Sequence, residues 1–280
     1  MNNYKYIKNF FIYFGLIVIT VVTVFPLLWC LSASLRSDTE FFKYITPFSI
    51  NTLIPIDFTL DSYVLLFTKF NFARPIINTV VVSLTTIIGG CLLNSIAAFA
   101  FACFKFKFKN ILFAIFLVSF MVPFEAISLP LYKVVSGLGW MNTYAGMIVP
   151  TIASGLVLFL FTQFFKDIPP SILEAARVDG ANLSQIFTKI VLPSSVTVFI
   201  TASLIIFMDQ WNAYLWPLLV ARSKDIQTIQ IALSAFKMER VTLWSCLYAG
   251  SMISAIVPLG LFLPTQKYFV QGITSSGVKG

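Results

Sequence analysis

The 280-residue sequence contains no histidine, and only 11% of its residues are charged. Without histidine, the chain cannot form a histidine-based catalytic triad, a histidine-ligated metal site or an imidazole proton relay. Soluble globular chains carry roughly 25% charged residues. The shortage of charge therefore excludes an ordinary soluble domain, because the chain cannot cover its surface with polar groups.

Cysteine is also scarce, and its spacing does not indicate chemistry. The four cysteines form no CxxC pair and lie in or beside apolar segments, at Cys30, Cys91, Cys103 and Cys246. This placement predicts small buried hydrophobic residues rather than a metal site or a disulfide framework. The G-x-x-x-x-G-K-(S/T) loop of P-loop ATPases is absent as well. We therefore predict no cofactor, no metal, no catalytic residue and no ATP hydrolysis by this chain.

Apolar residues are abundant: they make up 58% of the chain and give a mean hydropathy of +0.89. Six stretches are free of charge, except that Glu125 interrupts the third and Asp209 the fifth. Each reaches the roughly 20 apolar residues that cross a bilayer core about 30 Å thick. Only helices satisfy their own backbone groups in lipid at these lengths, so we predict an all-α integral membrane protein with six transmembrane helices. The stretches are 9–35, 75–104, 110–132, 134–165, 190–221 and 241–266.

Charge in the short loops predicts the orientation. Six spans place both termini on one side of the membrane, together with loops 105–109 and 166–189. That side has ten of the nineteen cations, and 105–109 alone holds three lysines; short loops weigh most in the positive-inside rule. We therefore predict an inner-membrane protein with both termini and loop 166–189 in the cytoplasm, and no nucleic-acid binding despite the net charge of +8. The first stretch follows Lys5 and Lys8 as a signal peptide would, but its length and the lack of a small-residue cleavage site favour a retained helix.

The ends of the apolar stretches divide the chain into segments. The extracytoplasmic loop 36–73 is long and rich in aromatic residues, which argues against disorder. We predict an N-terminal segment with the first helix (1–35), this loop (36–73), a five-helix core (74–267) that contains a polar loop (169–193), and a cytoplasmic tail (268–280).

The polar loop carries signals for the start of a helix. Pro169 and Pro170 end the preceding helix, and Ser171 lies three residues before Glu174, which is the spacing of a capping box. We therefore predict that a short helix starts at Ser171.

The same loop also carries signals for a turn. Asp179-Gly180 ends the first helix, because glycine adopts the left-handed conformation without a steric penalty. Asn182 and Gln185 repeat the capping spacing and predict a second helix. The helix–turn–helix is either an interfacial elbow that only connects two spans or a surface on which a partner docks.

The segment Glu174–Pro193, EAARVDGANLSQIFTKIVLP, resembles the EAA loop of permease subunits of binding-protein-dependent ABC importers. The resemblance implies a type I ABC importer permease fold, in which this loop is the coupling helix that inserts into the ATPase subunit. Small residues at 175 and 176 would permit close approach, while Glu174 would pair with a cation there or cap its own helix. The matching positions are Glu174, Ala175, Ala176, Asp179, Gly180, Ile190, Leu192 and Pro193.

Two more segments resemble the MalG-like carbohydrate permeases of this family, namely Trp211–Val220 (WNAYLWPLLV) and Leu263–Gly280. Ala213 departs from their pattern, which commonly has an acidic residue at that position. The resemblance implies a non-catalytic subunit that forms half of the translocation path for a sugar or oligosaccharide. It also implies a second, MalF-like permease, ATPase subunits and an extracytoplasmic solute-binding protein as partners. Glycerol-3-phosphate or a polyol is the alternative cargo, since those permeases share the same signatures.

Two carboxylates lie within the apolar stretches, where charged groups are costly and mark functional candidates. At about 1.5 Å per residue, Glu125 and Asp209 both lie towards the outer ends of their predicted spans. They therefore either line the translocation path or reach interfacial water. Trp211 and Asn212 are further candidates for the path, although an interfacial aromatic belt also explains the tryptophan.

Two other functional classes fit the sequence less well. An ion-coupled secondary transporter would need an intramembrane charge network and leaves the EAA-like loop without a purpose. A membrane-embedded enzyme would need a catalytic constellation, yet the sequence has no histidine and only two intramembrane carboxylates, in different spans.

Overall fold

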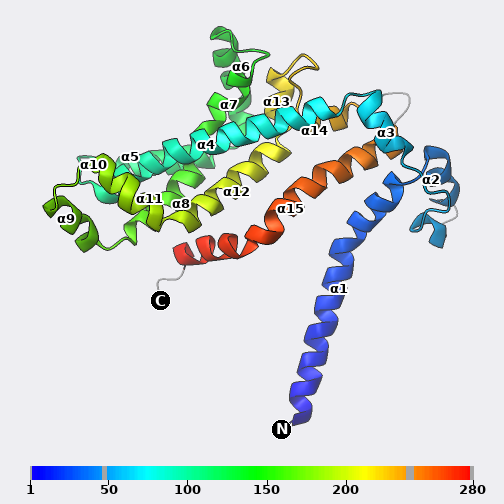
Figure 1. The fold of residues 1–280 in the computed structure, drawn as a ribbon, viewed down its shortest axis with the longest axis horizontal. Helices are drawn as coiled ribbons and strands as arrows, with labels where there is room; N and C mark the ends of the chain where they lie inside the picture. The colour runs from blue at the N-terminus through cyan, green and yellow to red at the C-terminus, as the bar shows by residue number, and fades with distance from the viewer. Residues whose placement is uncertain (1, 46–48, 238–242, 278–280) are drawn as a thin grey trace. The chain divides into compact units, whose positions relative to one another are not determined.

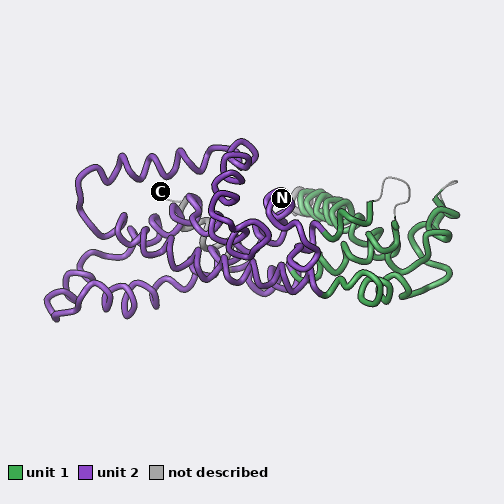
Figure 2. The backbone as a smooth tube through the Cα atoms, turned by 90° about the horizontal axis from the view of Figure 1, so that it is seen from above, with its two compact units in different colours: residues 1–73, 232–257 green, residues 74–231, 258–280 purple. Residues whose placement is uncertain are grey.

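A computed structural model describes residues 2–45, 49–237 and 243–277, and the regular elements in these ranges are helical (Figure 1). The chain forms two compact units, which Figure 2 colours separately: residues 1–73 with 232–257, and residues 74–231 with 258–280. The helices of the first part of the chain are α1 (Asn2–Ser34), α2 (Asp38–Ile45), the 3-10 turn η1 (Ile50–Thr52) and α3 (Asp61–Thr68). The later helices are α4 (Ala73–Cys103), α5 (Lys109–Met121), α6 (Phe124–Gly137), α7 (Tyr144–Ile152), α8 (Gly155–Lys166), α9 (Pro170–Val178), α10 (Leu183–Ile186), the π-helix η2 (Phe187–Val191), α11 (Leu192–Ser194), α12 (Val196–Asn212), α13 (Leu215–Val220), α14 (Ile229–Ser234) and α15 (Trp244–Gly277).

By length and composition, six membrane spans are available in the described part of the chain, but only three are single helices. These three are Tyr6–Ser34, Ala73–Cys103 and Trp244–Lys267. The other three are pairs of helices bent at a short break: α5 and α6 by 99°, α7 and α8 by 42°, and the segment 183–194 and α12 by 80°. The predicted number of six agrees with this arrangement when each bent pair counts as one span. The predicted continuous helices at 110–132, 134–165 and 190–221 are wrong in detail.

The break between α5 and α6 follows from Pro123. Val122 precedes this proline and is extended, with φ −71° and ψ 122°. A proline disfavours the helical conformation of the residue before it, and here Val122 is extended, so the helix predicted over 110–132 stops at Met121. Glu125 then lies in the first turn of α6, beyond the bend.

The break between α7 and α8 is held by a buried asparagine of α4. The Asn94 side-chain amide donates to the carbonyl of Ile152 at 2.9 Å, and its oxygen accepts from the Ser154 amide at 3.2 Å. The Ser154 hydroxyl in turn caps α8 by accepting from Val157. Because these backbone groups find partners, the break is tolerated in an apolar environment.

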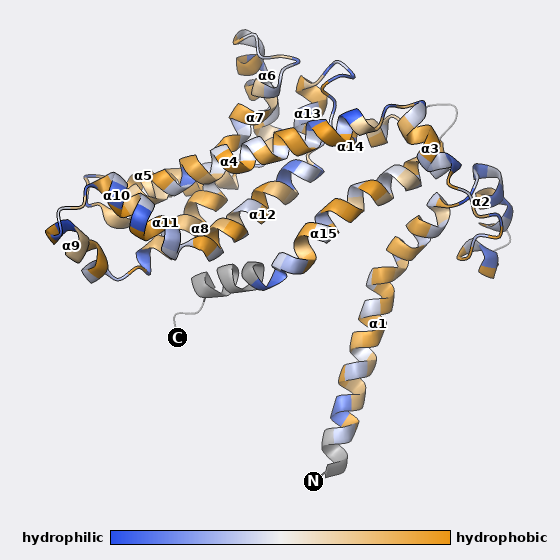
Figure 3. Cartoon of the chain, viewed as in Figure 1, coloured by the Kyte–Doolittle hydropathy of each residue, from blue (hydrophilic) through white to orange (hydrophobic). Residues whose placement is uncertain are grey.

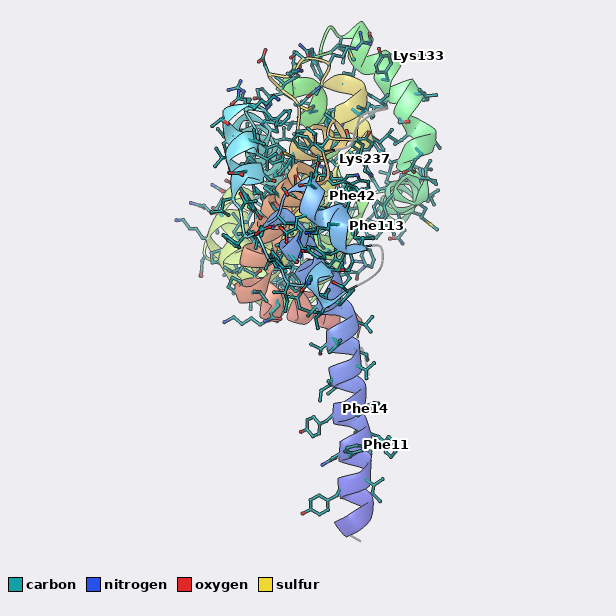
Figure 4. The ribbon with its side chains drawn as sticks, turned by 90° about the vertical axis from the view of Figure 1, so that its right-hand side faces the viewer. Phe11, Phe14, Phe42, Phe113, Lys133 and Lys237 are labelled. Atoms are coloured by element: carbon teal, nitrogen blue, oxygen red, sulfur yellow. The ribbon has the colours of Figure 1, made fainter. Side chains whose placement is uncertain are left out.

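Helix α1 is almost unburied along its apolar length, and its described packing lies at its C-terminal end, where Ser32, Ala33 and Ser34 are buried. None of the most apolar window of Tyr6–Ser34 is buried, and Figure 3 shows hydrophobic residues along most of the helix, with hydrophilic ones towards its N-terminus. Phe11 and Phe14 project freely from it in Figure 4. A helix that is hydrophobic all round is stable only when lipid or other helices surround it.

The first unit contains ordered structure where the sequence predicts a long loop. Arg36 is fully buried, and its guanidinium donates to the carbonyls of Ser32 and Asn51. The buried Glu40 carboxylate accepts from the amides of Ile56 and Asp57, the former at 2.8 Å. Burial lowers the pKa of Arg36, and the charge of Glu40 opposes that shift. These side chains tie α2 and η1 to the end of α1.

The second unit is organised along α4, which contributes to two separate apolar clusters. One lies at the end of α4 that leads into α5, called the loop end, and the other lies nearer the start of α4, called the far end. The loop-end cluster joins α4 to α8, α9, η2 and α12, with Phe101, Phe161 and Val191 among its buried members. The far-end cluster joins α4 to α6, α7 and α13 through Val82, Met147 and Trp216, among others. In Figure 1, α9 and α10 lie beside the end of α4 that leads into α5. The far end includes loop 138–143, α13 and segment 222–228.

Candidate coupling site

The polar loop forms the predicted helix–turn–helix, but its first helix starts one residue earlier than expected. Helix α9 begins at Pro170, with Pro169 in the cap position and no side-chain hydrogen bond to the cap. The predicted capping box between Ser171 and Glu174 is therefore wrong. Proline suits the first helical position because its φ is already helical and its missing N–H would be unpaired there. Glu174 is left exposed, with no capping role.

The turn after α9 has the predicted glycine geometry. Gly180 has a φ of +79°. Its amide donates to the Arg177 carbonyl at 3.1 Å, and the Ala181 amide donates to the Ala176 carbonyl at 2.9 Å. This pair of hydrogen bonds is a Schellman motif, in which the residue after the helix cap is left-handed. The turn therefore depends on glycine at position 180.

The second helix starts with the predicted capping box. The Asn182 side chain accepts from the Gln185 amide, and the Gln185 side chain accepts from the Asn182 amide, both at 2.9 Å. Helix α10 passes into the π-helix η2 and then α11, which contains Pro193. The backbone bends by 80° before α12 begins at Val196. π-Helical turns often occur at functional sites.

The residues of this helix–turn–helix divide into an anchoring set and an exposed set. Ala176, Ile186, Phe187 and Val191 are buried in the loop-end cluster, and Leu173, Ile190 and Leu192 pack against it. Ala175, Asp179, Gly180 and Pro193 are exposed together with Glu174. The two alanines that the EAA resemblance treats alike therefore differ, because Ala175 faces outward and Ala176 anchors the helix.

Three large apolar side chains extend the exposed set. Val178 is 87% exposed, and Ile172 and Leu183 are also exposed. Leu183 was not singled out in the sequence, although its place next to the Asn182 cap puts it on the outer surface of the turn. Exposed apolar side chains on this polar loop are candidates for contact with another protein.

The candidates for the translocation path lie on two different elements. Asp209, Trp211 and Asn212 lie at the end of α12, while Glu125 lies at the start of α6. Asp209, Asn212 and Glu125 are exposed, whereas Trp211 is only 1% exposed and stacks on Phe207 with ring centroids 5.2 Å apart. In this conformation the indole of Trp211 belongs to the core of the unit.

At the far end, polar side chains of α4 bind a backbone segment that the sequence did not indicate. The buried Asn78 donates to the carbonyls of Asp225 and Gln227 at 2.8 and 2.9 Å, and it accepts from the Tyr144 hydroxyl at 2.6 Å. Arg74 also donates to the Asp225 carbonyl. Segment 222–228 is thus fastened to α4, and the same asparagine also binds α7.

Within the described ranges, no group of three or more histidine, cysteine or acidic residues could hold a metal ion. The C-terminal pattern is covered in part: the α15 backbone continues to Gly277, and residues 278–280 lie outside the described residues.

Comparison with known proteins places these features in a family. The family model for binding-protein-dependent transport system inner membrane components matches residues 90–266. The arabinooligosaccharides transport system permease protein AraQ of Halalkalibacterium halodurans is 34% identical over 269 residues, which cover 95% of both chains. The sn-glycerol-3-phosphate transport system permease protein UgpE of Rhizobium meliloti is 31% identical over 274 residues, with 96% of this chain and 97% of UgpE covered.

The fold also matches a solved structure. A chain in the crystal structure of a bacterial ABC transporter involved in the import of the acidic polysaccharide alginate superposes with a TM-score of 0.83. The match covers 94% of this chain and 96% of that chain, at 19% sequence identity. The predicted type I importer permease architecture is therefore confirmed at the level of the fold.

Proposed function

Because this chain belongs to the family of binding-protein-dependent transport system inner membrane components, we propose that it forms half of the translocation path of an ATP-driven importer for a sugar or oligosaccharide. The observation that carries the proposal is the exposed apolar surface of α9 and α10, defined by Ile172, Ala175, Val178 and Leu183. ATP hydrolysis takes place on partner subunits. A second permease completes the path, and a solute-binding protein delivers the cargo.

The same surface explains how the ATPase acts on the path. The ATPase contacts Ala175 and Val178 on the outside of α9, while Ala176 on the same helix is buried in the loop-end cluster. A displacement of α9 is therefore transmitted to α4, α8 and α12, whose side chains interdigitate in that cluster. Packed interiors transmit displacements because they deform little.

The cargo is inferred from the relatives, which support two classes of substrate. AraQ supports an oligosaccharide, while UgpE supports glycerol-3-phosphate. Competition of labelled oligosaccharide uptake by unlabelled sugars, polyols and glycerol-3-phosphate separates the two classes. If only glycerol-3-phosphate competes, the cargo is glycerol-3-phosphate and not an oligosaccharide.

Co-reconstitution tests the function itself. The chain, its sibling permease, the ATPase and the binding protein are expressed together, and ATP-dependent uptake into proteoliposomes is measured. The complete complex should transport, while this chain alone should neither hydrolyse ATP nor move sugar. Uptake by the chain alone under a proton or sodium gradient would instead support a secondary transporter.

The docking surface is tested by adding charge at its centre. Ala175→Glu places a carboxylate on the proposed interface and should weaken co-purification of the ATPase by at least tenfold. Ser136→Glu is the matched control, since Ser136 is also exposed but lies at the end of α6. Equal loss of the ATPase in both variants would refute the assignment of this surface.

The proposed orientation places both termini and the coupling site in the cytoplasm. Cysteines at two highly exposed positions, Ile50→Cys in the first unit and Val178→Cys in α9, are labelled in intact cells with a membrane-impermeant maleimide. Only the first should react before the cells are opened, and the parent chain reports the background from its four natural cysteines. Labelling of position 178 from outside would overturn both the topology and the coupling role.

A further inference from the structure

The short turn that joins α4 to α5 has an unusual sequence and an unusual backbone. Residues 104–109 read Phe-Lys-Phe-Lys-Phe-Lys. Phe108 lies in the left-handed region, with φ 64° and ψ 13°. A bulky side chain in that region is a genuine outlier that costs free energy. Strain of this kind persists where the surrounding structure enforces it and is often found at functional positions.

Two lysine side chains of the turn are exposed, and a third binds the backbone of the turn. Lys105 and Lys107 are exposed. The Lys109 ammonium instead donates to the Phe104 carbonyl at 2.9 Å, so that it satisfies a carbonyl just after the end of α4. The Lys107 ammonium lies 5.1 Å from the centre of the Phe108 ring. The two exposed charges therefore project from the turn beside exposed aromatic rings.

A fourth cation joins this group from another helix. Lys166, in the last turn of α8, has its ammonium 5.4 Å from the centre of the Phe113 ring on α5. The exposed acidic residue closest to it in sequence is Asp167. Lys105, Lys107 and Lys109 therefore give the turn itself three positive charges, and Lys166 adds a fourth beside α5, next to Asp167.

The surface that continues from the turn is suited to acyl chains. None of the residues of α5 is buried, although α5 packs on α8. Ile111, Ile115 and Val118 are all more than half exposed, and they share one face of the helix because they recur at intervals of four and three residues. At the turn itself, the Phe106 and Phe108 side chains are also exposed.

We propose that the turn 104–109, with Lys166 and the outer face of α5, is a binding site for anionic phospholipid. The lysines bind the phosphate-containing headgroup, while Phe108 and the face of α5 contact the glycerol backbone and the acyl chains. The turn connects two membrane helices, so it lies at the depth of the headgroups, where basic residues attract anionic lipid. In the proposed orientation, this leaflet is the cytoplasmic one.

Lipid retention by the assembled complex tests this site without any need for turnover. The complete complex is placed in nanodiscs of phosphatidylcholine with increasing phosphatidylglycerol, and bound phosphatidylglycerol is measured by native mass spectrometry after delipidation. Lys105→Gln with Lys107→Gln should weaken retention by about fivefold for each charge removed. Lys105→Arg with Lys107→Arg should restore it, because the charge is retained.

Matched controls separate this site from general electrostatics and from the ATPase contact. Lys133→Gln with Lys224→Gln removes two exposed lysines at other positions of the same unit, one of them visible on α6 in Figure 4, and should leave retention unchanged. Equal losses in both double variants would overturn the site. Unchanged lipid retention with a weakened ATPase would also overturn it and would assign the lysines to the protein interface. Because the measurement uses no ATP, failure of the transport proposal would not alter its outcome.

Phe108→Gly gives an independent test of the aromatic contribution. Glycine relieves the positive φ, so the turn itself should become no less stable, while the ring is lost from the lipid contact. Weaker phosphatidylglycerol retention with unchanged thermal stability is expected. Unchanged retention would show that the ring has no part in the site.

Discussion

The two ends of the second unit are built in opposite ways. At the far end, Asn78 and Asn142 bind the backbone of segment 222–228 directly, so the carbonyls of Asp225 and Gln227 and the Ser223 amide are satisfied within the chain. At the loop end, hydrogen bonds remain local to each helix cap, and apolar side chains such as Val178 point outward. The comparison shows that long-range hydrogen bonds hold the far end together, whereas the loop end is held by local helix caps and apolar packing.

The largest expected effect comes from crowding the far end. A Cβ on Gly146 would lie 2.3 Å from the Trp140 carbonyl oxygen and 3.0 Å from a methyl group of Val220. Since the nearest atom is backbone, it cannot move aside easily, and Gly146→Ala should destabilise the unit by on the order of 3 kcal/mol. The yield of folded, detergent-soluble protein should fall sharply in size-exclusion chromatography. Gly137→Ala is the control, because nothing lies within 4 Å of its Cβ position, and equal losses in both would contradict the steric explanation.

A glycine at the loop end should show the reverse pattern, with folding preserved and activity lost. A Cβ on Gly180 meets no atom within 4 Å, so only the φ of +79° opposes substitution. Gly180→Val should therefore insert and assemble but abolish ATP-driven uptake, because a β-branched residue disfavours this turn strongly. Gly180→Asn should keep a measurable part of the uptake, since asparagine tolerates the left-handed region. Normal uptake by well-expressed Gly180→Val would show that the turn geometry is not needed for coupling.

Removal of one polar fastening at the far end should have an intermediate effect. Asn78→Ala leaves the carbonyls of Asp225 and Gln227 and the Tyr144 hydroxyl without this partner, and an unsatisfied buried group costs about 1–3 kcal/mol. Tyr144→Phe removes only one of these hydrogen bonds and should cost about 1 kcal/mol. Thermal unfolding of the purified complex measures both, and Asn212→Ala, at an exposed asparagine of α12, serves as control. A double variant no worse than Asn78→Ala would confirm that the two residues act as one network.

The smallest effect is expected from the cap of α10. Asn182→Ala removes the side chain that accepts from the Gln185 amide and should cost about 1 kcal/mol of local helix stability. Hydrogen exchange of the amides at 184–186 should become faster, while global unfolding is unchanged. Faster exchange that also includes amides of α12 would mean that α10 and α12 open together, and would contradict the local character of the hydrogen bonds at the loop end.

Much of this architecture could be predicted from the sequence because the signals are local. The apolar runs, the left-handed glycine at 180 and the Asn182–Gln185 cap depend only on neighbouring residues. The start of α9 was misplaced because Ser171 offered the capping spacing while Pro170 already satisfied the helix start. Hydropathy reports how apolar a segment is and does not indicate where its backbone bends, so it predicts the three bent spans as continuous helices, although Pro123 marks the bend between α5 and α6.

The sequence by itself determined that this chain is a helical membrane protein with a helix–turn–helix in the loop between two spans. Hydrophobicity and capping are properties of residues close together in the chain. The tertiary structure decided which face of that helix–turn–helix is anchored, since Ala175 and Ala176 are chemically identical and only the packing of α4, α8 and α12 buries one of them. It also decided that the span breaks between α7 and α8, because the hydrogen bonds that permit the break come from Asn94, some sixty residues earlier. Contacts between distant residues depend on how the helices pack, and packing is a property of the folded unit as a whole.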